Sequence, residues 1–325
     1  AQDGRVVVYM GDDERNEYIY KFVSRQAYNA SNREANFDLL DEGTLYVAKF
    51  SANGTGTWLE LTQGKNGLTA SNGFADQAEV LLKTRQAADR AGATMMDRPE
   101  WVAVHPTTKE VYITLTNNSN RGGSPASSNS SAGTTSAGSA RPPVDAANPR
   151  ARNVFGHIIR WVEASGDPAA TQFAWSIFVL AGDPANTDPN KQGNIQGDAF
   201  GSPDGLWFDY FGRLWIQTDV STSVLNTGDY KNLGNNQMLC ADWRTGEIRR
   251  FLTGPKGCEI TGSTSTLDGT SMFISIQHPG EPASERNDPA NPKAVSSWPD
   301  GANGGRPRSA TIVIQRNDGG VVGGL

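Results

Sequence analysis

Residues 202–219 read SPDGLWFDYFGRLWIQTD, and this stretch contains two short apolar runs separated by a tight polar turn. Asp204 stands just before the first run, and Asp219 follows the second. Runs rich in Leu, Ile, Trp and Phe that are bounded by Gly, Pro and Asp are typical of β-strands joined in a hairpin. The stretch therefore predicts an acidic residue, a strand, a turn, a strand and a polar end, in that order.

The same order of features recurs in two other parts of the chain. Residues 98–118 read RPEWVAVHPTTKEVYITLTNN, and residues 258–278 read CEITGSTSTLDGTSMFISIQH. In an antiparallel hairpin, the start of the first strand and the end of the second lie at the same edge. Each acid is therefore expected beside the polar end of its own hairpin, which gives the pairs Glu100 with Asn118, Asp204 with Asp219, and Glu259 with His278.

This internal repeat predicts an all-β propeller, because two further β-rich runs follow each hairpin and complete a four-stranded blade. Blades around an axis bring their first strands toward a central channel, so the three opening carboxylates would face one another there. Clustered carboxylates are costly unless cations or protons neutralise them. Their oxygens are hard ligands that suit Ca²⁺ or Mg²⁺, and the repeat therefore predicts a metal site in the channel.

The ends of the repeat suggest that the chain is part of a larger propeller. Residues 4–13 read GRVVVYMGDD and match the second strand of a hairpin, with Asp12 and Asp13 at the polar end. The partner first strand is expected upstream. The chain is therefore expected to supply three and a half to four blades of a single propeller domain that spans residues 1–325, with the N-terminal blades missing.

Two segments interrupt the strands. Residues 74–90 place Ala78, Leu81, Leu82, Arg85 and Ala88 at helical spacing, and Gly92 follows as a stop signal, so residues 74–92 are predicted to form a helical insertion. Residues 122–144 are rich in Ser, Gly, Ala and Pro, and this composition predicts a flexible low-complexity loop.

The composition excludes several kinds of partner. The net charge is −6 and no stripe of Lys and Arg is present, which argues against a nucleic-acid partner. No run of about 18 apolar residues occurs, so no membrane span is predicted. Cys240 and Cys258 lie outside any metal or redox spacing, and the count alone leaves open whether they pair.

Arg98 is the strongest candidate for an anion-binding residue. It lies two positions before Glu100, so on an extended segment both side chains can point toward one face. One interpretation is a salt bridge that orients Glu100, and the other is a rigid fork that binds an anionic group such as phosphate. Among the histidines, His278 is favoured over His105 and His157 to line the channel, as a ligand or a proton donor.

At these same residues the sequence resembles the PhoX-type alkaline phosphatases. The resemblance implies a six-bladed propeller with an iron–calcium cluster in its channel, which hydrolyses phosphomonoesters in the periplasm or outside the cell. By that analogy Arg98 binds the phosphoryl group, and Glu100 and then Asp204 ligate metal. The matching stretches are GRVVVYMGDD (4–13), EYIYKFVS (17–24), GTLYVAKF (43–50), GATMMDRPEW (92–101), SPDGL (202–206), LWIQTD (214–219) and QHPGE (277–281).

The resemblance extends less firmly to the other candidates. Asp13, Asp219 and Glu259 are further metal-ligand candidates, and His278 and Asn118 are candidates for contact with substrate in the channel. The family also has an upstream segment that supplies a cysteine ligand to iron, and that segment does not occur here. Because neither cysteine stands in such a motif, the Fe³⁺ site of this chain is expected to be incomplete.

Two alternative functions remain at this point. A calcium-dependent six-bladed lactonase would also place Glu, Asn and Asp around one metal ion. It needs a general acid or base rather than a phosphate clamp, so Arg98 beside Glu100 favours the phosphatase. The other alternative is a non-catalytic propeller that binds ligands or partner proteins, and this alternative predicts that the purified protein contains no metal.

Overall fold

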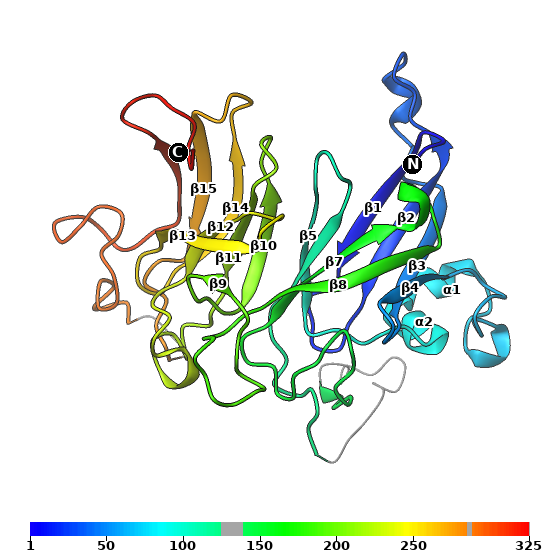
Figure 1. The fold of residues 1–325 in the computed structure, drawn as a ribbon, viewed down its shortest axis with the longest axis horizontal. Coiled ribbons are helices and arrows are strands. Elements are labelled where there is room, and N and C mark those ends of the chain that lie inside the picture. The colour runs from blue at the N-terminus through cyan, green and yellow to red at the C-terminus, as the bar shows by residue number, and fades with distance from the viewer. Residues whose placement is uncertain (125–138, 285–287, 325) are drawn as a thin grey trace. The chain divides into compact units, whose positions relative to one another are not determined.

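The computed structural model of the chain describes residues 1–124, 139–284 and 288–324. Most of the regular structure in these residues is β-strand (Figure 1). The strands are β1 (Arg5–Gly11), β2 (Ile19–Ala27), β3 (Gly43–Phe50), β4 (Thr55–Glu60), β5 (Pro99–Val104), β6 (Val111–Leu115), β7 (His157–Glu163), β8 (Gln172–Leu180), β9 (Gln196–Gly197), β10 (Pro203–Phe208), β11 (Leu214–Thr218), β12 (Gln237–Ala241), β13 (Glu247–Thr253), β14 (Glu259–Ser265), β15 (Ser271–Gln277) and β16 (Ala310–Gln315).

Helices are few and short. Within the described ranges the α-helices are α1 (Gln77–Leu82) and α2 (Thr84–Ala91), and the 3-10 helices are η1 (Glu34–Asn36), η2 (Ala70–Asn72), η4 (Ala164–Gly166) and η5 (Gly228–Tyr230).

The described strands form three sheets, of eight, five and three strands. Their orders are β1-β2-β3-β4-β8-β7-β6-β5, then β10-β11-β12-β13-β9, and finally β14-β15-β16. The two strands of each predicted hairpin are neighbours in these orders, so the three predicted hairpins are confirmed. The mostly β class is confirmed as well, whereas the number of blades in a complete ring stays a prediction.

Burial shows which strands are covered on both faces. Every residue of β6 and β11, the second strands of their hairpins, is buried, so these strands are covered on both faces. In β15, by contrast, Met272, Ile274 and Ile276 are buried and alternate with partly exposed residues. This period of two is the pattern of a strand with one face packed on the core.

The N-terminal strand opens the eight-stranded sheet. β1 stands at one end of the strand order and pairs antiparallel with β2, which pairs with β3, and β3 pairs with β4. β4 then pairs with β8, which joins two runs of four strands into one sheet. That β1 is the second strand of a blade stays a prediction.

The chain divides into two compact units. Unit 1 comprises Ala1–Val102, Lys109–Asn153 and Ile159–Ile177, and unit 2 comprises Ala103–Thr108, Val154–Ile158 and Phe178–Leu325. Arg98 and Glu100 belong to unit 1, whereas Asp204 and Glu259 belong to unit 2. Each unit is described by itself below.

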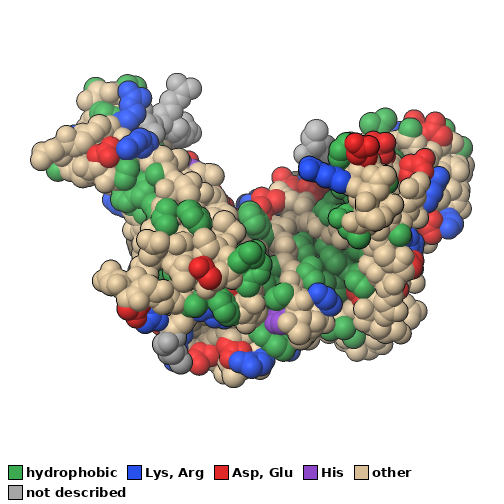
Figure 2. Space-filling view, turned by 90° about the horizontal axis from the view of Figure 1, so that it is seen from above, with side chains coloured by type: hydrophobic (Ala, Val, Ile, Leu, Met, Phe, Trp, Pro, Cys, Tyr) green, Lys and Arg blue, Asp and Glu red, His purple; other side chains and the backbone are tan. Residues whose placement is uncertain are grey.

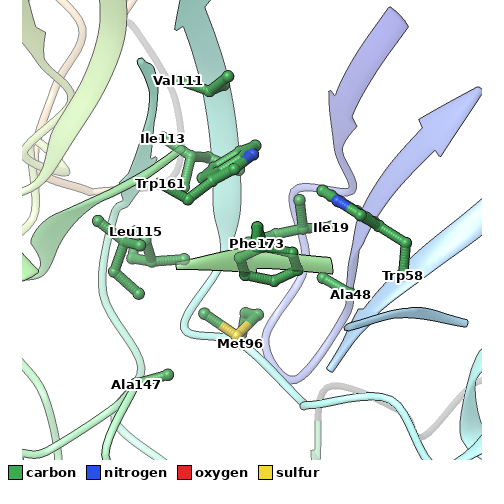
Figure 3. Close-up of a cluster of buried hydrophobic side chains, with 11 residues drawn as sticks. Ile19, Ala48, Trp58, Met96, Val111, Ile113, Leu115, Ala147, Trp161 and Phe173 are labelled. Carbon is green, nitrogen blue, oxygen red and sulfur yellow. The ribbon is translucent and has the colours of Figure 1, made fainter. Parts of the chain in front are cut away.

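The core of unit 1 is built around aromatic side chains from several strands (Figure 3). The ring of Trp58 lies 6.0 Å from that of Trp161 and 5.2 Å from that of Phe173 between centroids, in tilted or edge-to-face contact. Such contacts add to the burial of large apolar surfaces. The remaining buried members are Ile19, Ala48, Met96, Val111, Ile113, Leu115, Ala147 and Ile159.

Glu163, at the end of β7, forms a charged centre inside this aromatic core. Its carboxylate accepts hydrogen bonds from the Tyr9 hydroxyl at 2.7 Å, from Trp58 Nε1 at 3.0 Å and from Trp161 Nε1 at 3.3 Å. The ammonium of Lys21, which is fully buried, lies 3.4 Å away. Burial raises the pKa of Glu163 and lowers the pKa of Lys21 to about 8. The pair is retained because each charge has several partners.

The helical insertion differs from its prediction. Residues 74–92 form two helices, because Lys83 has φ −107° and ψ 40° and interrupts the helical backbone. The break shifts the buried face to Val80, Ala87 and Ala88, whereas Leu82 is 85% exposed. Asp76 caps α1 through Glu79 N at 2.9 Å, and Gly92 ends α2 with φ 78°, as its position predicted.

Unit 2 has its own core, which gathers side chains from β11, β12, β14 and β15. The fully buried ring of Trp215 lies in this cluster and contacts Phe251 at 5.0 Å between ring centroids. The buried members are Trp215, Met238, Cys258, Ile260, Met272, Ile274, Ile276 and Val322.

Two further predictions concern the surface and the loops. On the face that Figure 2 shows, Lys and Arg side chains are scattered among Asp and Glu side chains, in keeping with the mixed composition. No helix within the described ranges is long and apolar enough to cross a membrane. The predicted loop at 122–144 falls largely on residues 125–138, which lie outside the described residues.

Candidate active site

Arg98, which stands just before β5 in unit 1, is held by Asp13 of the β1–β2 loop. The distances are 2.9 Å from Arg98 Nε to Asp13 Oδ1 and 2.9 Å from Nη2 to Oδ2. This two-pronged, charge-assisted contact fixes the plane of the guanidinium. The side chain of Arg98 is 23% exposed and that of Asp13 is 37% exposed, so the pair stays in contact with solvent.

The meeting of these residues depends on a close approach between β1 and β5. A Cβ atom on Gly11, the last residue of β1, would lie 2.4 Å from the carbonyl oxygen of Glu100 and 2.5 Å from that of Pro99. Any side chain at residue 11 would therefore push the start of β5 away. Glycine at this position lets the loop that carries Asp13 pass directly beside Arg98 and Glu100.

Behind Arg98 lies a buried polar network centred on Asp97. Asp97 accepts hydrogen bonds from Arg121 Nε at 2.9 Å, from Asn118 Nδ2 at 3.0 Å and from Asn153 Nδ2 at 2.9 Å. All four residues are essentially fully buried. Asn118 also donates to Asn16 Oδ1 at 2.8 Å. The structure thus places Asn118 within the support of the site, and its contact with substrate stays a prediction.

Unit 2 brings together four of the predicted residues. Glu259 opens β14, and its carboxylate lies 3.6 Å from Nε2 of His278, which follows β15. Burial raises the pKa of Glu259, and the negative charge of Asp219 raises it further. The charge of His278 and hydrogen bonds with His278 and Asp204 lower the pKa of Glu259 in part. The predicted neighbours Glu259 and His278 therefore lie together in this unit, and the convergence of Glu100, Asp204 and Glu259 stays a prediction.

The three hairpins share a backbone feature that sequence reasoning missed. The residue two positions before each acid has a left-handed backbone: φ is 57° at Arg98, 51° at Ser202 and 66° at Gly257. The carbonyls of Arg98 and Ser202 each accept a hydrogen bond from the residue after the second strand, Thr116 at 3.1 Å and Asp219 at 3.0 Å. The structural equivalent of Asp219 is therefore Thr116, two residues before Asn118.

This turn has a chemical consequence. It bends the backbone just before each acid, and β5, β10 and β14 each stand at the end of their strand order, so each acid lies on an edge strand. Left-handed backbone costs a non-glycine residue about 1–2 kcal/mol. Such strain is concentrated at functional sites, where the surrounding structure maintains it. Arg98 and Ser202 carry no glycine signal, and so this feature could not be predicted from their sequence positions.

The residues described so far have the chemistry to bind an anion and cations. An oriented guanidinium suits phosphate, and a set of neighbouring carboxylates suits hard cations. A family model described as alkaline phosphatase PhoX matches residues 1–280 of the chain.

The chain belongs to the PhoX alkaline phosphatase family.

Comparison with solved structures agrees with PhoX membership. The chain is similar to Pseudomonas fluorescens PhoX in complex with vanadate, a transition state analogue, with 50% sequence identity and a TM-score of 0.86. The match covers 99% of this chain and 52% of that one, so the chain spans about half the length of that PhoX. The structure of polysaccharide lyase Uly1 also matches, with 10% identity and a TM-score of 0.27. That match covers 85% of this chain and 48% of that one, and it carries no argument. A comparison with curated proteins found no match.

The two cysteines differ from the thiolate that the PhoX resemblance implies for iron. Both are free, and burial raises the pKa of Cys240 to about 11 and that of Cys258 to about 12. Both are therefore neutral thiols near pH 7. Within the described part of the chain, no group of three or more His, Cys, Asp or Glu side chains is arranged to hold a metal ion.

Proposed function

We propose that this chain supplies part of a metal-dependent alkaline phosphatase that hydrolyses phosphomonoesters. The observation that carries this proposal is the 50% identity, over 99% of the chain, to a PhoX whose structure contains vanadate, a transition state analogue. Vanadate adopts the five-coordinate geometry of a phosphoryl group in transfer, so a fold that binds it is suited to that transition state.

Arg98 is the proposed phosphate-binding residue. Asp13 holds the Nε–Nη2 edge of its guanidinium, and a guanidinium has a second fork, formed by Nη1 and Nη2, that matches two oxygens of a phosphoryl group. An arginine held in place before the substrate arrives needs little reorganisation as charge develops in the transition state. Arg98 is therefore assigned to binding the substrate and stabilising the transition state.

The carboxylates fit calcium ions by their chemistry. Asp204, Asp219 and Glu259 provide hard oxygen donors in one unit, and Glu100 provides another in unit 1. The raised pKa of Glu259 reports repulsion that a cation would relieve, because burial and the charge of Asp219 both disfavour its ionised form. A bound calcium ion would neutralise charge on the phosphoryl oxygens and orient the reacting groups.

The chain's residues do not fit the implied iron site in the same way. Cys258 is a buried member of the apolar core of unit 2, and Cys240 packs against the same core, so neither thiol is placed among polar ligands there. No role is therefore assigned to iron through these residues. Asp13 is proposed to orient Arg98 in preference to ligating metal, since both of its oxygens contact the guanidinium.

The larger setting follows from family membership. We propose that the chain contributes to a six-bladed propeller that works in the periplasm or outside the cell. Its partners are phosphomonoester substrates, together with the rest of the propeller. His278 lies beside Glu259 at 3.6 Å and is proposed to face the same site.

The decisive experiment measures turnover of p-nitrophenyl phosphate by the purified protein and by the variants Arg98→Ala and Glu100→Ala. Each variant is expected to lose about 10²–10³-fold in kcat/KM, as when one preorganised charge-stabilising group is removed. Circular dichroism is expected to show an unchanged fold. Wild-type turnover by both variants would contradict the proposal.

The same preparation separates the alternatives. Chelator-sensitive hydrolysis of lactones without hydrolysis of p-nitrophenyl phosphate would identify a lactonase. A protein that lacks both activities and contains no metal by elemental analysis would be a non-catalytic binding module.

A further inference from the structure

We propose that Arg85, on helix α2, is a positioning residue for Arg98 and acts through the consecutive aspartates Asp12 and Asp13. The inference rests on the proposed function, because it concerns how Arg98 is oriented toward phosphate. All four residues belong to unit 1.

The two aspartates hold two arginines side by side. Asp12 binds Arg85 in a two-pronged contact, with 2.7 Å from Nε to Oδ2 and 2.5 Å from Nη2 to Oδ1. Asp13 binds Arg98 with the same pair of nitrogens, at 2.9 Å and 2.9 Å. Glu14 N donates to the Asp12 carbonyl at 2.8 Å, which closes a tight turn with Asp13 at its centre, so a shift of the Asp12 backbone also moves Asp13.

Arg85 stands on a well-anchored element. Ala87 and Ala88 of the same helix are fully buried in a core cluster with Val47 and Leu61. Next to them, the hydroxyl of Tyr18 donates a hydrogen bond to Asp89. The backbone of Arg85 is therefore fixed relative to β2 and β3, which form the other side of this cluster.

The backbone of the loop is tied by its own hydrogen bonds, and Arg85 binds one of its side chains. Asp12 N donates to the Tyr18 carbonyl at 3.1 Å, and Asn16 N donates to the Met96 carbonyl at 2.9 Å. Between these two ties, Asp12 and Asp13 reach outward to their arginines. Glu17 Oε2 lies 3.7 Å from Arg85 Nε, which adds a second acid to the anchor.

Loss of Arg85 should therefore affect the site more than the fold. The side chain of Arg85 is 53% exposed, and exposed ion pairs contribute little to stability. Misplacement of a binding group by about 1 Å can nevertheless cost up to about 100-fold in rate. We expect a loss of about tenfold in vanadate affinity for Arg85→Ala, with an unchanged melting temperature.

The test titrates the purified protein with vanadate by calorimetry and compares Arg85→Ala, Arg85→Lys and Asp12→Asn. Removing Arg85 makes the protein more negative, whereas Asp12→Asn makes it less negative. A long-range charge effect would therefore weaken anion binding in the first variant and strengthen it in the second. Positioning predicts weaker binding in both, by about tenfold, with Arg85→Lys between wild type and Arg85→Ala.

Two further variants complete the design. Arg90→Ala removes an exposed arginine from the same helix, whose Nε contacts the Gly67 carbonyl at 3.4 Å instead of the loop, and it should bind vanadate as wild type does. In an Arg98→Ala background, Arg85→Ala should cause no further loss, because the residue that it positions is gone.

The outcomes separate the two hypotheses. Unchanged or tighter binding by Asp12→Asn, or an equal loss from Arg85→Ala with and without Arg98, would overturn the inference alone. Wild-type vanadate affinity in Arg98→Ala would overturn the proposed role of Arg98 itself. If Arg85→Ala failed to fold, Arg85→Lys and Asp12→Asn would still decide between positioning and charge.

Discussion

At the scale of single residues, Glu17 shows how burial shapes chemistry near the candidate site. It is 1% exposed, and burial raises its pKa to about 7. Arg85 acts against this shift, and the charges of Asp12, Asp89 and Glu14 add to it. The folded protein therefore keeps a proton on Glu17 at pH values where the unfolded chain has lost it.

The sign of the resulting pH dependence follows directly. The pKa of Glu17 is about 4.5 in the unfolded chain and about 7 in the folded protein. Between these pH values the folded state binds more protons than the unfolded state, so stability falls as pH rises. Glu17→Gln should remove this pH-dependent loss of stability. Its free energy of unfolding should exceed that of wild type by about 1–3 kcal/mol at pH 8, but not at pH 4. Urea denaturation at the two pH values measures this, and equal pH slopes for both proteins would contradict it.

At the scale of secondary-structure elements, the Glu163 centre links four strands. The carboxylate ends β7 and accepts hydrogen bonds from Tyr9 on β1, Trp58 on β4 and Trp161 on β7, while Lys21 on β2 pairs with it. Each donor loses its acceptor if the carboxylate is removed, and Lys21 loses the negative charge that offsets the burial of its ammonium.

Glu163→Ala should therefore destabilise the protein by about 3–5 kcal/mol, the usual cost of breaking a buried ion pair at one side. The double variant Glu163→Leu with Lys21→Met should be less affected, since it leaves no buried charge without a partner. Thermal unfolding of wild type and both variants decides the matter. If the single variant lost less stability than the double variant, the charge pair would not be the reason for the stability of this core.

The elements also show what the sequence could and could not predict. The hairpins β10–β11 and β14–β15 were predictable because alternation and turn residues are local signals. The break of the helical insertion at Lys83 was not predicted, since the helical spacing of residues 74–90 continues through that position. The contact between Asp13 and Arg98 joins residues 85 positions apart, and no periodicity reports such a pair.

At the scale of the whole molecule, the proposed metal ligands are divided between the two compact units. Asp204, Asp219 and Glu259 stand on the hairpins β10–β11 and β14–β15 of unit 2, and their role as metal ligands stays a prediction from the repeat. Arg98 and Glu100 belong to unit 1, where the close approach at Gly11 sets their surroundings. The number of blades and the identity of the metals depend on more than these residues and stay proposals.

Calcium should accordingly stabilise specific strands rather than the entire chain. At 100 times its Kd, a ligand of the folded state contributes about 2.7 kcal/mol. Hydrogen exchange in calcium against EGTA should show slower exchange at the starts of β10 and β14, and no change in α1, whose carboxylates Asp76 and Glu79 serve its cap and helix surface. Glu259→Gln should abolish the difference at β14. Uniform protection, or none, would contradict the proposed ligands.

The left-handed turns before the three acids carry a consequence for mutational tolerance. Gly257 must also leave room for the backbone of Glu281, because a Cβ there would lie 2.5 Å from the Glu281 carbonyl oxygen. Ser202 shares a hydrogen bond of 2.7 Å with the Tyr230 hydroxyl, and Arg98 must supply a guanidinium from the same strained backbone. A screen that selects for folding should favour glycine at residue 98, while a screen that selects for turnover should retain only arginine. The two selections therefore conflict at this residue: Arg98→Ala removes the guanidinium and leaves the backbone strain as it is, whereas Arg98→Gly removes the guanidinium and relieves the strain.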